Sequence, residues 1–133
     1  MKTNELMIGD WVSAGYNSKV TGIDLNTDAI RIAGNIGWFK TNEHEPIPIT
    51  PEILEANGFV PVEIRGGTEY SNPSAGVGLI KVDSYDYWIE NIEVGCMSLH
   101  GSLKYVHEFQ HALRLSGIVE LADNFVIKKG GQQ

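Results

Sequence analysis

The segment Ser102–Gly117, SLKYVHEFQHALRLSG, decides how this chain folds, because it is the longest stretch with a helical period. At about 100° per residue, one arc collects the apolar side chains Tyr105, Val106, Phe109, Ala112 and Leu113. The opposite arc is polar and collects Lys104, His107, Glu108, His111 and Arg114. Ser102 is the expected N-cap, and Gly117 is the expected left-handed residue after the last turn, with Ile118 as the apolar contact of a Schellman ending. The pattern predicts an amphipathic helix from 102 to 117.

The same segment contains the motif H-E-x-x-H, spelled by His107, Glu108, Phe109, Gln110 and His111. Two histidines one turn apart can bind one zinc ion, and the glutamate between them can act as general base. Over these few residues the chain weakly resembles zinc peptidases of the zincin class. That hypothesis places zinc on His107 and His111, water activation on Glu108, and a third ligand on Glu120.

The surroundings of the motif favour a simpler interpretation. No His or Cys follows His111, which leaves only Glu120 and Asp123 as downstream side-chain ligands. Lys104 and Arg114 share the face of the two histidines, and cations beside a divalent metal are unfavourable. The favoured interpretation is therefore a solvated polar face, on which Lys104 pairs with the glutamate one turn later. No metal or cofactor is then expected, and zinc belongs to the alternative.

Composition limits the class of protein. The chain has 133 residues, of which 42% are hydrophobic, so it is long enough for one domain or for two small subdomains with a real core. Its net charge of −7 argues against nucleic-acid partners and anionic membranes, which require clustered Lys and Arg. An acidic nucleic-acid mimic remains as an alternative, although no block of like charges appears.

Cysteine usage and hydropathy suggest a cytoplasmic protein. Cys96 is the only cysteine, so no internal disulfide is possible, and a small buried hydrophobe is its expected role. No apolar run has the length of a membrane span, and the N-terminal residues lack the apolar region of a signal peptide.

The first part of the chain predicts a small antiparallel sheet. Tight turns separate four short strand-like runs, at residues 11–12, 19–23, 29–33 and 36–39. A strongly bent sheet of this kind is typical of small SH3-like barrels. Trp11 and Trp38 are candidates for an aromatic groove that binds a peptide, although filling the barrel is the more common role of such indoles.

The second part predicts a short helix, a β-meander and the long helix. Thr50 as N-cap, Pro51 at the first helical position and Gly58 after the end indicate a helix of about two turns. Strands are expected at 59–64, 79–82, 87–94 and 96–100, with the long helix packed across them. The Gly- and Ser-rich stretch 65–78 is expected as a mobile loop that carries Tyr70, and one of the apolar runs in 118–127 as a final strand.

These elements predict an α+β fold in three parts. Residues 1–48 form a β-barrel-like subdomain, residues 49–127 form a helix, meander and C-terminal helix subdomain, and residues 128–133 form a disordered polar tail.

Three phrases resemble a known group of proteins. They are LMIGDWV at Leu6–Val12, PIPITPEILEANGF at Pro46–Phe59 and LKYVHEFQHALRLSGI at Leu103–Ile118. In this order and spacing they are similar to small uncharacterised proteins of gut Bacteroidales genomes, mobile elements and phages. The resemblance implies no activity. Some members of that group carry Gln and Asn at the positions of Glu108 and His111, which implies that the helix does not require the motif.

The functional hypothesis that follows is a non-enzymatic protein-interaction or regulatory module with a protein partner. Its candidate surface residues are Trp11, Trp38 and Tyr70. The alternatives are a minimal zinc hydrolase that uses the motif at 107–111 and the acidic nucleic-acid mimic. Oligomeric state does not follow from the sequence.

Overall fold

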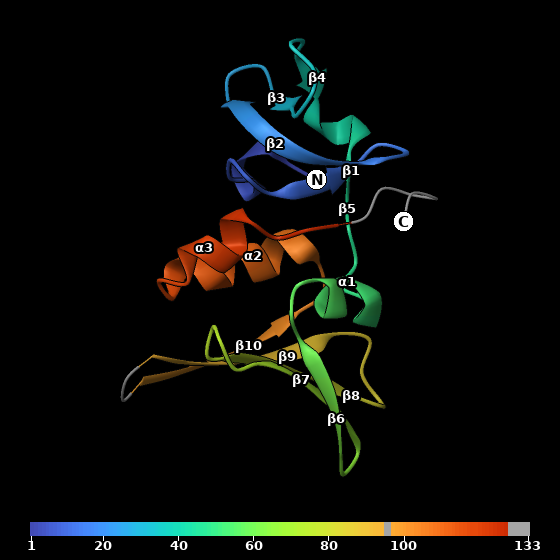
Figure 1. Cartoon of the computed structure of the whole chain (residues 1–133). Helices are drawn as coiled ribbons and strands as arrows, with labels where there is room; N and C mark the ends of the chain where they lie inside the picture. The colour runs from blue at the N-terminus through green and yellow to red at the C-terminus, as the bar shows by residue number, and fades with distance from the viewer. Residues whose placement is uncertain (95–96, 128–133) are drawn as a thin grey trace.

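The computed structural model describes residues 1–94 and 97–127, and it describes side chains outside 90–100. It confirms a mixed helix and sheet fold, with two antiparallel five-stranded sheets and few helices. The first sheet lies at one end of the molecule and the second at the other, with the two C-terminal helices between them (Figure 1). The segment around Ser102–Gly117 therefore contacts both sheets, rather than one.

The first sheet has the strand order β4-β3-β2-β1-β5. Its strands are β1 (Trp11–Ser13), β2 (Asn17–Asp24), β3 (Ala29–Ile32), β4 (Phe39–Lys40) and β5 (Glu45–Pro46). Short 3-10 helices, η1 (Thr3–Glu5) and η2 (Thr41–Glu43), precede β1 and β5. The sheet encloses a small apolar cluster made of Leu6, Val12, Val20, Ile30 and Ile32.

Three of the four strands predicted for this region correspond to β1, β2 and β3. The predicted strand at 36–39 is wrong, because β4 begins only at Phe39 and the residues before it form an exposed loop. Ile36 is 94% exposed in that loop, so its hydrophobicity did not reflect burial. The two edge strands β4 and β5 do not pair with each other, so the SH3-like barrel stays a prediction.

The second sheet has the order β10-β9-β8-β7-β6, in which every neighbour is also the next strand in the chain. Its strands are β6 (Val60–Ile64), β7 (Gly67–Asn72), β8 (Val77–Val82), β9 (Trp88–Val94) and β10 (Met97–Leu103). One face packs under the helices and supplies Tyr70, Leu79, Trp88 and Leu103 to the larger core. The predicted meander is therefore present, with one more strand than expected.

The extra strand corrects the prediction of a mobile loop at 65–78. β7 occupies most of that stretch, and Tyr70 on it is buried against Trp88, with ring centroids 5.3 Å apart. Glycine at position 67 has a packing role, since a Cβ there would lie 2.2 Å from the carbonyl oxygen of Lys81. The glycine that resembled a loop signal instead permits close strand contact.

Two short helices flank the core. Helix α1 (Pro51–Ala56) begins as predicted, because the Thr50 hydroxyl accepts a hydrogen bond from the N–H of Ile53 at 3.3 Å. Helix α3 (Val119–Asp123) lies where a final strand was predicted. The strand prediction was wrong because α3 and the residues after it pack on α2 and bury Ala122, Phe125 and Ile127, a requirement that local sequence does not reveal.

Helix α2 (Val106–Leu115) is shorter than predicted at its start. Ser102 is not the N-cap, because it pairs with Ile89 inside β10. The start of α2 is instead held by the connector between the sheets, where the N–H of Val106 donates to the carbonyl of Ile47 at 2.8 Å. The predicted Schellman ending is confirmed, since the N–H of Ile118 donates to the carbonyl of Leu113 at 2.8 Å.

Some predictions lie outside the described residues, namely those for Cys96 and for the tail 128–133. Within the described residues, no helix combines the length and the apolar character required to cross a membrane.

Replacing Gly117 by alanine tests the C-terminal signal of α2. Gly117 has φ of 84°, and an added Cβ would meet nothing within 4 Å, so the cost is backbone strain alone. We expect a loss of about 1 kcal/mol in the free energy of unfolding, measured by urea denaturation. Gly37→Ala is the control, because that glycine has equally open space and no left-handed φ, and it should change stability little.

Candidate functional site

The polar face of α2 lies against the start of β1, so the prediction of a solvated face is wrong. His107 and Gln110 are buried, and His111 and Arg114 are mostly covered. The segment they contact is Gly9–Trp11, at the entry to the first sheet. We call these contacts the α2–β1 junction, since they join the helix to the other half of the molecule.

Gln110 supplies three hydrogen bonds of the junction. Its Nε2 donates to the carbonyl of Gly9 at 2.8 Å and to the carbonyl of Ala122 at 3.0 Å. Its Oε1 accepts from the N–H of Trp11 at 3.0 Å. A fully buried amide that satisfies backbone groups on β1 and α3 fixes both segments to α2.

Asp10 is the charged centre of the junction. Its carboxylate is fully buried and accepts from the N–H of Met7 at 2.8 Å and from Arg114 Nη1 at 2.7 Å. His111 Nε2 lies 2.5 Å from Oδ2 of the same carboxylate. Gly9 makes room for this pairing, since a Cβ there would lie 2.7 Å from Arg114 Nη2. The paired charges and the glycine together position the polar face of α2.

His107 lies beside the ion pairs without joining them. Its ring stacks on Tyr105 and meets His111 edge-on, with centroids 6.1 Å and 5.7 Å away. Its Nδ1 finds no hydrogen-bond partner among the described residues. Burial lowers the pKa of His107 below its usual 6.5, and the nearby carboxylate of Asp10 opposes that shift. The neutral ring is therefore the form that the folded protein favours.

Glu108 stabilises the start of the helix. Its Oε1 accepts from the N–H of Tyr105 at 2.9 Å and from the N–H of Lys104 at 3.0 Å. These are the contacts of a capping-box glutamate at the third helical position. The predicted ion pair between Lys104 and Glu108 is wrong, because Lys104 precedes the helix and its amine lies over the ring of Tyr105.

Of the zinc candidates, His107 and His111 lie side by side, with ring centroids 5.7 Å apart. Glu120 is exposed on α3, where it lines a surface hollow with Val119 and Ser74. Within residues 1–94 and 97–127, no three or more His, Cys, Asp or Glu side chains are grouped so that they could hold a metal.

The three aromatic candidates lie in different places. Trp11 is half-buried at the junction, and its Nε1 donates to the carbonyl of Phe125 at 2.7 Å. Tyr70 is buried under the helices. Trp38 is exposed, and the guanidinium of Arg31 lies 4.7 Å from its ring centroid.

A groove with a volume of ≈ 500 Å³ opens beside Trp11. The β1–β2 hairpin forms one wall and the residues after β3 form the other, with the lining Trp11, Tyr16, Asn17, Ser18, Lys19, Ala33, Gly34 and Asn35. Sequence reasoning missed Tyr16, whose signal was an aromatic residue directly after a turn glycine.

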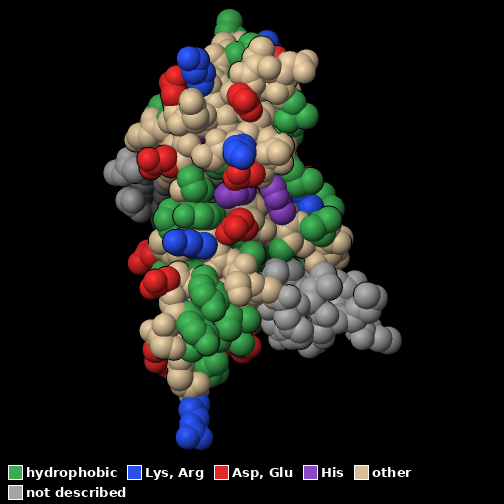
Figure 2. All heavy atoms as spheres, turned by 180° about the vertical axis from the view of Figure 1, so that it is seen from behind, with side chains coloured by type: hydrophobic (Ala, Val, Ile, Leu, Met, Phe, Trp, Pro, Cys, Tyr) green, Lys and Arg blue, Asp and Glu red, His purple; other side chains and the backbone are tan. Residues whose placement is uncertain are grey.

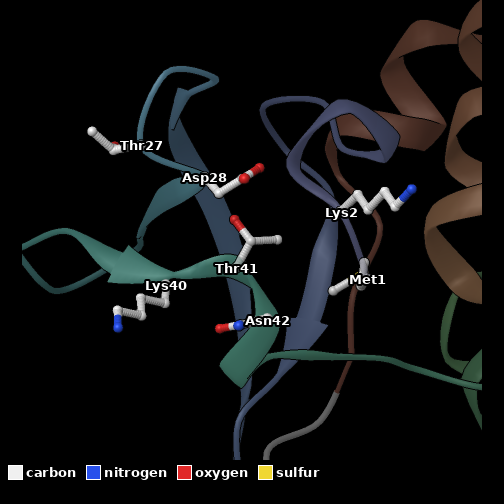
Figure 3. A pocket seen from close by; sticks show the side chains of 7 residues that line it. All are labelled: Met1, Lys2, Thr27, Asp28, Lys40, Thr41 and Asn42. Carbon is white, nitrogen blue, oxygen red and sulfur yellow. The ribbon is translucent and has the colours of Figure 1, made fainter.

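A second hollow, of ≈ 350 Å³, lies between the N-terminal residues and η2. Figure 3 shows Lys2 and Lys40 pointing in opposite directions from it, while Asp28 points toward the N-terminal segment. The charged groups do not converge, so this hollow lacks the arrangement of a binding site for a small ion.

Comparisons of the chain with protein-family models, with curated proteins and with solved structures found no match.

Replacing Asp10 by asparagine tests the charge at the junction. The substitution leaves Arg114 and His111 beside a neutral, buried amide, so we expect a loss of about 3 kcal/mol in the free energy of unfolding. Asp123→Asn is the matched control, because Asp123 also pairs with Arg114 but is 55% exposed, and it should cost less than about 0.5 kcal/mol. Equal effects would contradict the central role of Asp10.

The lowered pKa of His107 predicts a pH effect on stability. His107 takes up a proton near pH 6.5 in the unfolded chain but only at lower pH in the folded protein. The contribution of neutral His107 to the free energy of unfolding is therefore fully present above pH 6.5, and it is lost as the pH falls through the folded pKa. His107→Gln stays neutral and should show a flatter decline. Urea unfolding of both proteins across this range measures the difference, and parallel curves would contradict the prediction.

Proposed function

We propose that this chain is a non-enzymatic protein-interaction module that binds an extended peptide segment in the groove between the β1–β2 hairpin and the residues after β3. The observation that carries the proposal is the lining of that groove, where Trp11 and Tyr16 stand beside Lys19. Grooves lined by aromatic rings recognise extended and proline-containing segments, because a flat ring offers large contact area at little cost in side-chain entropy.

The contacts of Tyr16 and Trp11 support this assignment. Tyr16 is 49% exposed at the tip of the hairpin, so its ring is available to a ligand. Trp11 is held by its hydrogen bond to Phe125 and by the amine of Lys19, which lies 5.6 Å from its ring centroid. One exposed and one fixed aromatic side chain would form the two sides of a peptide site.

The finer architecture of the first sheet is part of the same proposal. We infer an SH3-like barrel, which is supported by three features: β1 pairs with both β2 and β5, η2 precedes β5, and the register of β2 shifts between Val20 and Gly22. Such a shift bends a strand and lets a small sheet curl toward closure.

The contacts of the H-E-x-x-H residues also favour binding over catalysis. Glu108 accepts two backbone N–H groups, and His111 contacts a buried carboxylate. A catalytic glutamate would have to leave these two N–H groups. The motif is explained by its structural contacts, so a hydrolytic role is not needed to account for it.

Selection from a library of displayed peptides, followed by titration into isotope-labelled protein, tests the proposal. We expect bound peptides to shift the resonances of Tyr16–Lys19 and Ala33–Asn35, and Tyr16→Ser to weaken binding by roughly tenfold. Tyr85→Ser is the matched control, because Tyr85 is 44% exposed and lies in the turn between β8 and β9 of the other sheet. The proposal fails if no peptide is enriched, or if both variants weaken binding equally.

A further inference from the structure

The strand β6 forms one edge of the second sheet, and among the described strands it pairs with β7 alone. All five of its residues are exposed, which is unusual for a strand with three large apolar side chains. Val60, Val62 and Ile64 are between 39% and 56% exposed. Because side chains alternate along a strand, these three lie on one face.

That face is the one turned away from the helices. The register pairs Val62 with Glu69, Glu69 with Ile80, and Ile80 with Ile89, whereas the buried residues Tyr70 and Leu79 belong to the opposite set. The helices lie on one side of this sheet in Figure 1. Figure 2 shows hydrophobic side chains gathered over the β6–β7 hairpin at the lower end of the molecule. The apolar side chains of β6 therefore lie on the face turned away from the helices, where Glu69 of β7 stands beside Val62 and Ile80 and Ile89 follow on the next strands.

The backbone of β6 is also open along its outer edge. Proline has no N–H, so Pro61 fits this strand with its nitrogen directed away from β7. By alternation, the N–H and C=O of Glu63 point the same way. An added strand would thus find a donor and an acceptor at Glu63 and a further acceptor at Pro61.

The helix side of the same edge is acidic. Glu63 on β6 and Glu52 and Glu55 on α1 are exposed, and no ion pair neutralises them within the described residues. All three lie near the phenol of Tyr70, whose pKa is raised by burial first and then by these carboxylates. One side of the edge is apolar, and the other carries uncompensated negative charge.

We propose that the open edge of β6 accepts an extended segment of a protein partner as a sixth strand, in which apolar residues alternate with Lys or Arg. The apolar residues of that segment contact Val60, Val62 and Ile64, and its basic residues face Glu63 and the two glutamates of α1. Backbone hydrogen bonds supply affinity in this mode, and the alternation supplies specificity. The proposal rests on the proposed function as an interaction module, but it concerns a surface on the other sheet from the groove.

The test uses a short synthetic peptide that alternates valine and lysine, with a valine–glutamate peptide as its counterpart. We expect only the valine–lysine peptide to bind, to shift resonances of β6, and to slow hydrogen exchange at the N–H of Glu63. Glu63→Lys should weaken binding roughly tenfold, because it puts like charges opposite one another. Glu43→Lys makes the same change in net charge at the exposed η2 and should leave binding unchanged.

Several outcomes would overturn the proposal. Equal binding of both peptides, no binding of either, or equal weakening by the two charge variants would remove the basis for charge selection. A chain that self-associates with the N–H of Glu63 already protected would assign the edge to a second copy. Shifts confined to Tyr16–Lys19 would place the peptide in the groove instead. Glu63→Pro is a second variant, which removes the outward N–H and should abolish binding if the strand adds as proposed.

Discussion

The side chain of Gln110 is the contact on which the arrangement of this molecule depends. Its amide donates to Gly9 and Ala122 and accepts from Trp11, so one buried group joins α2 to β1 and α3. The two sheets do not share one apolar core, because the buried apolar residues form two separate clusters, one in each half. Trp11 is the exception, because it belongs to the first sheet and packs on the larger cluster. Polar contacts at the junction therefore orient two parts that hydrophobic burial alone would leave loosely related.

The H-E-x-x-H pattern shows why a short motif needs its structural context. The helix was predictable from the period of Val106, Phe109 and Leu113, all of which are buried as expected. The error lay in the other face, where polarity was taken to mean contact with water. Polar residues also line junctions between two packed parts, and only the partner segment distinguishes these cases. Asp10 was that partner, but in the sequence it resembled an ordinary turn residue after glycine.

Elements with strong local signals were predicted well. Thr50 and Pro51 located α1, and Gly117 located the end of α2, because caps depend on residues within one turn. Elements that depend on distant partners were not. β7 contains glycine and polar residues, and it is a strand because β6 and β8 pair with it on both sides. Ser102 resembled a cap, yet pairing with Ile89 places it in β10, where a ladder of hydrogen bonds outweighs one capping bond.

The two surfaces proposed for binding lie where the packing of the helices leaves each half uncovered. Helices α2 and α3 lie between the sheets, so they cover the inner side of each half and leave the outer features uncovered (Figure 1). On the first sheet the uncovered feature is the hairpin groove with Tyr16, and on the second it is the edge of β6. An exposed apolar edge strand favours unwanted pairing between copies unless something opposes it. Pro61 removes one donor and Glu63 repels an identical edge, so both discourage self-association, and the charge of Glu63 would also select a partner of opposite charge.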